Sequence, residues 1–269
     1  MPYAISNDGT KVHYVDSGGD GPAMILLHSF AMDVDVWQPQ IDDFAPGMRV
    51  LAVDSRGHGG TPDNGVPFTY WDTAWDTWAV ADHAGIDEPV VVVGLSQGGF
   101  TAMRMALQHP RRVRGLVLIG TVAAGPSAQE RETYDNITVK HLIDGDVPLA
   151  EITPTMAAVT IGGDRERHQL PWVEKWSVAD RRAWRLAAHS LIDRDDISVL
   201  VRDITCPALI MRGGSDQAVS NAEMIELAGQ LGGPTRTETI RGDGAAHICT
   251  WTHPELCNPL IREFIEHIR

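Results

Sequence analysis

The stretch VVVGLSQGGF, residues 91–100, places a serine between two glycines at the end of an apolar run. The run predicts a buried strand, and the spacing of Phe100, Met103 and Leu107 behind it predicts a helix. A Gly-x-Ser-x-Gly sequence at a strand-to-helix turn permits a tight, strained backbone that exposes the serine hydroxyl. We therefore predict that Ser96 is a nucleophile, with a polar turn residue as the alternative interpretation.

Short apolar runs alternate with segments of helical spacing on both sides of this stretch, which is typical of βα units around a mostly parallel sheet. The predicted strands are residues 11–16, 23–28, 49–54, 90–94, 113–120, 208–213 and 235–240. The predicted helices are residues 70–85, 98–109, 221–231 and 254–268. Four of the strand runs carry almost no polar residue in their middles, as expected of strands covered on both faces. The predicted fold class is therefore α/β.

Residues 121–203 break this rhythm, with prolines and tryptophans among short helical pieces. An excursion of this length without a strand is too long for an ordinary loop. We predict that it forms a helical lid, and that residues 1–120 and 204–269 together form the core.

The formal net charge of −14 would repel phosphate backbones and anionic lipid headgroups, so we exclude nucleic acid and membrane surfaces as partners. The N-terminus lacks a basic and apolar leader, and no long apolar run occurs. These features lead us to expect a cytoplasmic protein that acts on a small molecule, and a homodimer is left open.

Three cysteines, Cys206, Cys249 and Cys257, are too few and too irregularly spaced for a disulfide framework or a zinc site. We expect them to pack as small apolar residues. None of the 11 histidines falls in a metal-ligand pattern, so no metal site is predicted.

A serine hydroxyl needs a general base, which is itself oriented by a carboxylate. Asp216 comes just after the predicted strand 208–213, at the end where open α/β sheets build their sites. His247 lies on a glycine-rich loop after the predicted strand 235–240. The predicted catalytic residues are therefore Ser96, Asp216 and His247.

Two other residues compete for these roles. Asp243 is an alternative acid on the same loop as His247, and His253 is an alternative base. His253 directly precedes a proline at a predicted helix start, where a capping or packing role is the simpler interpretation.

With these residues in place, the chain resembles the α/β-hydrolase superfamily, in its lidded carboxylesterase and lactonase branch, over essentially its whole length. The matching segments are GLSQGG, LLHSF at 26–30, VDSRGHGGT at 53–61, GGSD at 213–216 and AAHICTWTHPE at 245–255. The resemblance implies a mostly parallel sheet with helices on both faces and a helical lid inserted after the sixth strand. It also implies a structural turn at Arg56, Gly57, His58 and Gly59.

The LLHSF segment resembles the loop that supplies a backbone N–H to the oxyanion hole in this superfamily. The resemblance implies Phe30 as that donor and Gln97 as the second. The family's glycine is replaced here by Ser29, as in 3-oxoadipate enol-lactonases, and serine has a cost for positive φ that glycine lacks. His28 is expected to support the loop by hydrogen bonding.

Dehalogenases and epoxide hydrolases of the superfamily have aspartate at the elbow, whereas serine implies an acyl-enzyme and a carbonyl substrate. We expect hydrolysis of a small carboxylic ester or lactone with no metal or organic cofactor. The alternatives are an enol-lactone or acyl-homoserine lactone hydrolase, a cofactor-free perhydrolase and a C–C bond hydrolase. A small-molecule receptor on a hydrolase fold is the alternative from another class.

Tryptophans are the main candidates for an apolar substrate pocket. We predict this role for Trp37, Trp172, Trp176 and Trp184, whereas Trp71, Trp75 and Trp78 are interpreted as helix packing. The arginines considered for binding a substrate carboxylate are Arg165, Arg167, Arg181, Arg182 and Arg185.

Overall fold

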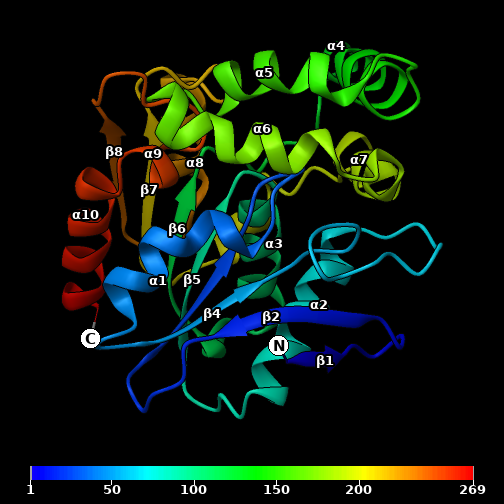
Figure 1. Cartoon of the computed structure of the whole chain (residues 1–269). Coiled ribbons are helices and arrows are strands. Elements are labelled where there is room, and N and C mark those ends of the chain that lie inside the picture. Colours follow the sequence, from blue (N-terminus) through cyan, green and yellow to red (C-terminus); the bar gives the residue numbers. More distant parts are fainter. Residues whose placement is uncertain (1, 269) are drawn as a thin grey trace.

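The computed structural model describes residues 2–268 and is built on one eight-stranded sheet of order β1-β2-β4-β3-β5-β6-β7-β8 (Figure 1). The strands are β1 (Tyr3–Ile5), β2 (Lys11–Asp16), β3 (Ala23–Leu27), β4 (Arg49–Val53), β5 (Val90–Leu95), β6 (Val113–Ile119), β7 (Ala208–Gly213) and β8 (Thr235–Ile240). β1 pairs antiparallel with β2, and β2 pairs antiparallel with β4. All ladders from β4 to β8 are parallel. The predicted α/β fold class is confirmed, and β1 is the strand that the prediction missed.

The helices include the four predicted ones, α2, α3, α8 and α10, at the expected places. Their bounds and those of the remaining α-helices are α1 (Gln38–Phe44), α2 (Tyr70–His83), α3 (Gln97–Gln108), α4 (Ala128–Tyr134), α5 (Leu149–Thr160), α6 (Leu170–Ser177), α7 (Arg185–Ile192), α8 (Asn221–Gln230), α9 (Cys249–Thr252) and α10 (Pro254–His267). No helix in residues 2–268 is long and apolar enough to cross a bilayer.

Alternate residues of the central strands point to opposite faces of the sheet. In β5, Val91 and Val93 join a core cluster that includes Phe44 of α1 and Ile261 of α10. Val92, between them, joins a second cluster with residues of α2, α3 and α8. The sheet is therefore covered on both faces, which explains why its central strands read as continuous apolar runs.

The chain leaves the sheet after β6 and returns to it at β7. The intervening helical insertion (residues 121–203) contains α4 to α7 and no strand, and it lies across the carboxyl ends of the strands in Figure 1. Ile143, Trp172 and Trp176 of the insertion belong to the same core cluster as Val93 and Ile119 of the sheet. The insertion therefore packs directly onto the edge where parallel α/β sheets build their sites.

Candidate active site

Ser96 sits at the sharp turn between β5 and α3. Its backbone has φ 54° and ψ −115°, a conformation that is strained for any residue with a side chain. The Ser96 N–H donates to the Ile119 carbonyl of β6 at 2.8 Å, which ties the turn to the next strand. A Cβ at Gly94 would collide with the backbone of Gly98, and one at Gly98 would collide with the carbonyl of Leu27. The two glycines of the motif are therefore required by close backbone approach.

The imidazole of His247 is hydrogen-bonded to Asp216, with 3.0 Å between Nδ1 and Oδ2, and both residues are buried. The other carboxylate oxygen of Asp216 accepts from the N–H groups of Ala218 and Val219 at 2.8 and 3.2 Å. Burial raises the pKa of Asp216, but the hydrogen bond and charge of His247 and these two N–H groups together hold the pKa below its ordinary value. Because the carboxylate is ionised, Nδ1 donates to it, and Nε2 is left with a lone pair that can accept a proton.

Two residues outside the predicted set shape this pair. Gly120, at the end of β6, has φ 54°, and a Cβ there would lie 2.9 Å from the Nδ1 atom of His247. Arg212, buried on β7, donates to the backbone carbonyls of Asp216 and Val219, each at 2.9 Å. Their sequence signals are a glycine closing a strand and an arginine inside an apolar run, and neither signal is specific.

Ser96 and His247 lie on the wall of one cavity of about 190 Å³ between the sheet and the helical insertion. Other residues on its wall include Phe30, Met32, Phe100, Tyr134, Trp176 and Arg194. Within residues 2–268 the Ser96 hydroxyl has no hydrogen-bonded partner, so it faces the cavity unengaged. In unliganded enzymes the bond between nucleophile and base is often long and tightens when substrate binds.

The two backbone groups expected to bind an oxyanion are unengaged. Gln97 is the first residue of α3, so its N–H has no acceptor within the helix. Neither this N–H nor that of Phe30 donates to another residue of the described chain. Ser29 does not have a positive φ, so the conformational cost expected of a serine at this position does not arise. The strained residue of this loop is Ala31, with φ 59°.

Hydrogen bonds from two directions hold Ala31 in this conformation. Its N–H donates to Nε2 of His58 at 3.0 Å, and its carbonyl accepts from Nε1 of Trp176, on α6, at 2.6 Å. Nδ1 of His58 donates to the Arg56 carbonyl at 3.0 Å. Burial, together with the neighbouring His28, lowers the pKa of His58 to about 3, so the imidazole stays neutral and can accept from Ala31.

Residues 56–59 form a turn that is held by buried hydrogen bonds and close packing. The Arg56 guanidinium makes two hydrogen bonds to Asp76, at 2.6 and 2.8 Å, and both side chains are buried. A Cβ at Gly59 would collide with the Asp54 carboxylate. His28 donates through Nδ1 to the carbonyl of the next residue at 2.8 Å, which is the loop-supporting bond expected of it.

Of the four tryptophans predicted to line a substrate pocket, Trp176 lines the Ser96 cavity. Trp37, Trp172 and Trp184 are not on its wall within the described chain; they are buried in the core cluster shared by the insertion and the sheet. The Trp184 ring lies 6.4 Å from that of Phe30. Their packing in this cluster keeps these three large side chains off the cavity wall.

The five arginines considered for a substrate carboxylate lie outside this cavity. Arg181 donates to backbone carbonyls of residues 145 and 147, and Arg185 pairs with Asp144. Arg165 and Arg167 line a different groove. The arginine that does reach the cavity is Arg194, which the sequence reasoning missed.

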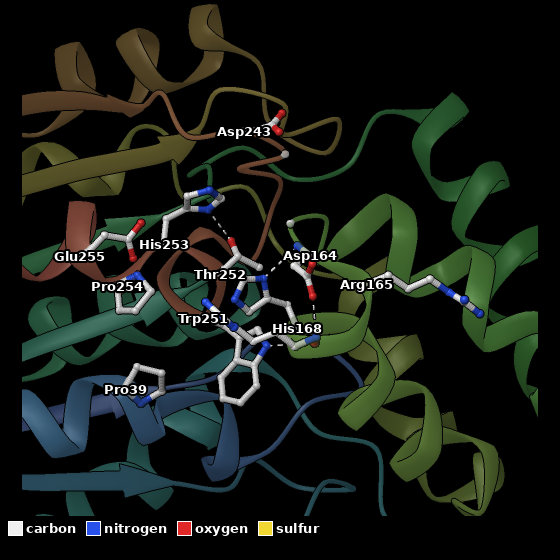
Figure 2. Close-up of a pocket in the computed structure, with 13 residues that line it drawn as sticks. Pro39, Asp164, Arg165, His168, Asp243, Trp251, Thr252, His253, Pro254 and Glu255 are labelled. Carbon is white, nitrogen blue, oxygen red and sulfur yellow. Dashed lines mark hydrogen bonds between the residues drawn. The ribbon is translucent and has the colours of Figure 1, made fainter.

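A larger groove of about 830 Å³ lies on another part of the surface, with neither Ser96 nor His247 on its wall (Figure 2). The competing residues Asp243 and His253 line it. His253 stands at the N-cap of α10 without a side-chain capping bond; its Nδ1 is hydrogen-bonded to the Thr252 hydroxyl at 2.8 Å. The described residues contain no group of three or more His, Cys, Asp or Glu side chains arranged to hold a metal ion.

The three cysteines are unpaired. Cys249 and Cys257 are buried in the core, and Cys206 is half-buried. Burial raises the pKa of Cys206 to about 11, so its thiol stays protonated near neutral pH.

Comparison with known proteins gives a consistent picture. A family model described as alpha/beta hydrolase fold matches residues 22–162, just over half of the 269-residue chain. The chain is 27% identical to the pimeloyl-[acyl-carrier protein] methyl ester esterase of Xanthomonas axonopodis pv. citri, over 95% of this chain and 99% of that protein. Among solved structures, a thermophilic esterase from Thermogutta terrifontis superposes with a TM-score of 0.85 at 24% identity, over 99% and 98% of the two chains. The enol-lactonase of Burkholderia xenovorans LB400 superposes with a TM-score of 0.84 at 25% identity, over 98% of this chain and 100% of the other.

Proposed function

The chain belongs to the alpha/beta hydrolase fold family, and on that premise we propose that it is a serine hydrolase that cleaves a small carboxylic ester or lactone through an acyl-enzyme. Its place among carboxylic ester hydrolases follows from the family and from relatives that are named esterases and lactonases. One observation supports the serine nucleophile and the acyl-enzyme. Ser96, strained at the elbow, faces a cavity that it shares with His247, whose Nδ1 is bonded to the buried carboxylate of Asp216.

In the proposed reaction, the Ser96 hydroxyl attacks the carbonyl carbon while Nε2 of His247 takes its proton. Asp216 stabilises the resulting imidazolium, and the tetrahedral oxyanion accepts hydrogen bonds from the N–H groups of Phe30 and Gln97. His247 then gives the proton to the departing alcohol oxygen. Water, deprotonated by the same histidine, attacks the acyl-enzyme, and the carboxylic acid leaves as Ser96 regains its proton.

The helical insertion would act as the lid of this site, with residues 1–120 and 204–269 as its core. Its packing over the carboxyl ends of the strands and its contribution of Trp176 and Arg194 to the cavity support this role. The cavity of about 190 Å³ suits a small molecule. The net charge of −14 makes nucleic acid an unsuitable ligand.

A lactone is the second candidate substrate, because the enol-lactonase structure covers this chain almost completely. Lactone and ester hydrolysis use the same acyl-enzyme, but in a lactone the alcohol remains attached to the acyl group. A panel of aliphatic esters, enol-lactones and acyl-homoserine lactones, with product analysis, separates the two and also detects perhydrolysis or C–C cleavage.

The first experiment measures hydrolysis of short-chain p-nitrophenyl esters by the wild type and by Ser96→Ala. Loss of the nucleophile should lower kcat by roughly 10³- to 10⁶-fold, since the remaining groups can no longer form the acyl-enzyme. Far-UV circular dichroism checks that the variant folds. Unchanged turnover in a folded Ser96→Ala protein would refute the proposal, and saturable ligand binding without turnover would favour a receptor.

A further inference from the structure

Arg194, just beyond α7 in the helical insertion, brings a positive charge to the wall of the Ser96 cavity. The residue is only 5% exposed. Its Nε donates to the Ala124 carbonyl at 3.3 Å, and its Nη1 donates to the Leu191 carbonyl at 3.0 Å. The guanidinium lies 4.7 Å from the ring centre of Phe100, which also lines the cavity. The Tyr134 hydroxyl is a further hydrogen-bonding neighbour of the guanidinium, whose five N–H groups are only partly used by these contacts.

Arg194 differs from the other buried arginines. Buried cations are usually paired with carboxylates, as Arg56 is with Asp76 and Arg104 is with Asp195. None of the ion pairs within residues 2–268 includes Arg194. Arg212 also lacks a carboxylate, but it is bonded to the backbone of the loop that it supports and does not line the cavity. Arg194 is thus a buried guanidinium on the cavity wall that makes no direct salt bridge, although its charge acts on the carboxylate of Glu130 nearby.

We propose that Arg194 binds a carboxylate of the substrate, so that the preferred substrates are esters or lactones carrying a second, free carboxylate. This inference rests on the hydrolase function proposed above. Phe100 follows Ser96 by about one turn of α3, or about 6 Å along the helix, and its ring contacts the Arg194 guanidinium on the wall of the same cavity. Because Ser96 and Arg194 line one cavity of about 190 Å³, we expect a short chain of carbons between the scissile carbonyl and the free carboxylate, as in monoesters of small dicarboxylic acids.

The groups around Arg194 are compatible with an incoming anion. Tyr134 lines the cavity, and burial raises the pKa of its phenol despite the opposing charge of Arg194, so the hydroxyl remains available as a donor. Glu130 and Glu223 also lie on this wall. Each accepts at 2.7 Å from the backbone N–H of the serine that caps its own helix, where the helix N-terminus stabilises the negative charge. The protein as a whole is strongly negative, with a formal net charge of −14. A preference for anionic substrates would therefore have to come from the local positive charge of Arg194.

The test compares kcat/KM across matched esters. The acidic set is the monoethyl esters of succinate, glutarate and adipate, and the neutral set is ethyl butanoate, pentanoate and hexanoate. The ethyl ester of 6-aminohexanoic acid supplies a cationic substrate. A second matched pair, 4-acetoxybutanoate and butyl acetate, tests a carboxylate on the alcohol side of the ester. Arg194→Gln should lower kcat/KM for acidic esters by about ten- to a hundredfold, the range for a lost hydrogen bond to a charged group, and change neutral esters by less than about threefold.

Two further variants control for charge and folding. Arg182→Gln removes the same charge from an exposed residue of the insertion that is not on the cavity wall, and it should keep the preference for acidic esters. Arg194→Lys retains a cation and should recover part of that preference. Equal slowing of acidic and neutral esters in Arg194→Gln, or a preference for the cationic ester, would overturn the inference while leaving the hydrolase function intact.

A binding measurement makes the inference independent of turnover. Glutarate and adipate should raise the Tm of Ser96→Ala, and the shift should disappear in Ser96→Ala/Arg194→Gln. Pentanediamide, the neutral diamide of glutaric acid and similar to it in size, should change the Tm of the two proteins almost equally. Dicarboxylate binding that survives loss of Arg194, or no dicarboxylate binding to Ser96→Ala, would contradict the inference whatever the enzyme hydrolyses.

Discussion

Asp216 and Asp243 are both acidic residues on loops beyond core strands, yet their surroundings differ. The Asp216 carboxylate is buried and accepts hydrogen bonds from His247 and two backbone N–H groups, whereas Asp243 is exposed beside the outer groove. A catalytic base is held in the productive tautomer by an ionised, hydrogen-bonded partner. The structure therefore favours Asp216 as the residue that orients His247.

Replacing each acid by its amide tests this assignment at the level of single residues. Asp216→Asn should lower kcat for p-nitrophenyl ester hydrolysis by roughly 10³- to 10⁴-fold, because the amide no longer stabilises the imidazolium or selects the tautomer. Asp243→Asn is the matched control and should stay within about twofold of the wild type. A larger loss in Asp243→Asn than in Asp216→Asn would reverse the assignment.

His58 should make the protein less stable in acid. Its pKa falls from an ordinary 6.5 to about 3 in the folded protein, so between these values the unfolded chain binds a proton that the folded chain does not. The free energy of unfolding is therefore undiminished by His58 above pH 6.5 and decreases as the pH falls towards 3, with a slope of up to about 1.4 kcal/mol per pH unit. Urea denaturation from about pH 7 to about pH 4 should show a shallower decline for His58→Asn than for the wild type. Parallel declines would show that another group is responsible.

At the level of elements, α6 is attached to the loop that carries Phe30, the proposed oxyanion donor. Besides the Trp176 bond to Ala31, Nζ of Lys175 pairs with Asp33 at 2.5 Å and Asp35 at 2.6 Å. The loop therefore receives part of its shape from a helix about 140 residues later in the chain. The backbone at Ala31 is strained and persists only where its surroundings hold it.

Trp176→Phe keeps an aromatic ring and removes the N–H that binds Ala31. We expect kcat to fall about tenfold with little change in KM, because a displaced Phe30 N–H weakens oxyanion binding in the transition state more than substrate binding. Trp251→Phe is the matched control, since it also removes an indole N–H bonded to a carbonyl of the insertion, that of His168, but away from this loop. Equal effects of the two variants on kcat would indicate a general loss of stability.

The elements differ in how well local patterns predict them. Central strands such as β3 and β5 are fully buried, so their sequences are continuous apolar runs that are easily recognised. The three-residue β1 and the four-residue α9 are too short to show a period. In the insertion, α5 contains Pro154 in its interior, and its neighbours include a π-helical segment at Asp135–Ile143, so no regular spacing marks their bounds.

At the level of the whole molecule, the insertion and the sheet share one core. Trp172, Trp176 and Trp184 of the insertion lie in the same buried cluster as residues of β3 to β7, α1 and α10. We expect one cooperative unfolding transition, with tryptophan fluorescence and far-UV circular dichroism giving the same midpoint in urea. A fluorescence transition at clearly lower urea would show that the insertion unfolds first and is a separate unit.

The sequence by itself determined the α/β class, the elbow that exposes Ser96, and a short set of candidates for its base and acid. These features depend on local physics: apolar runs that must be buried, and glycines at 94 and 98 where no Cβ fits. Tertiary structure decided that Asp216 lies against His247, that Trp176 reaches the cavity, and that Arg194 rather than the other arginines considered lines the Ser96 cavity. Those outcomes depend on how the insertion packs across the sheet, which is set by contacts between residues far apart in the chain.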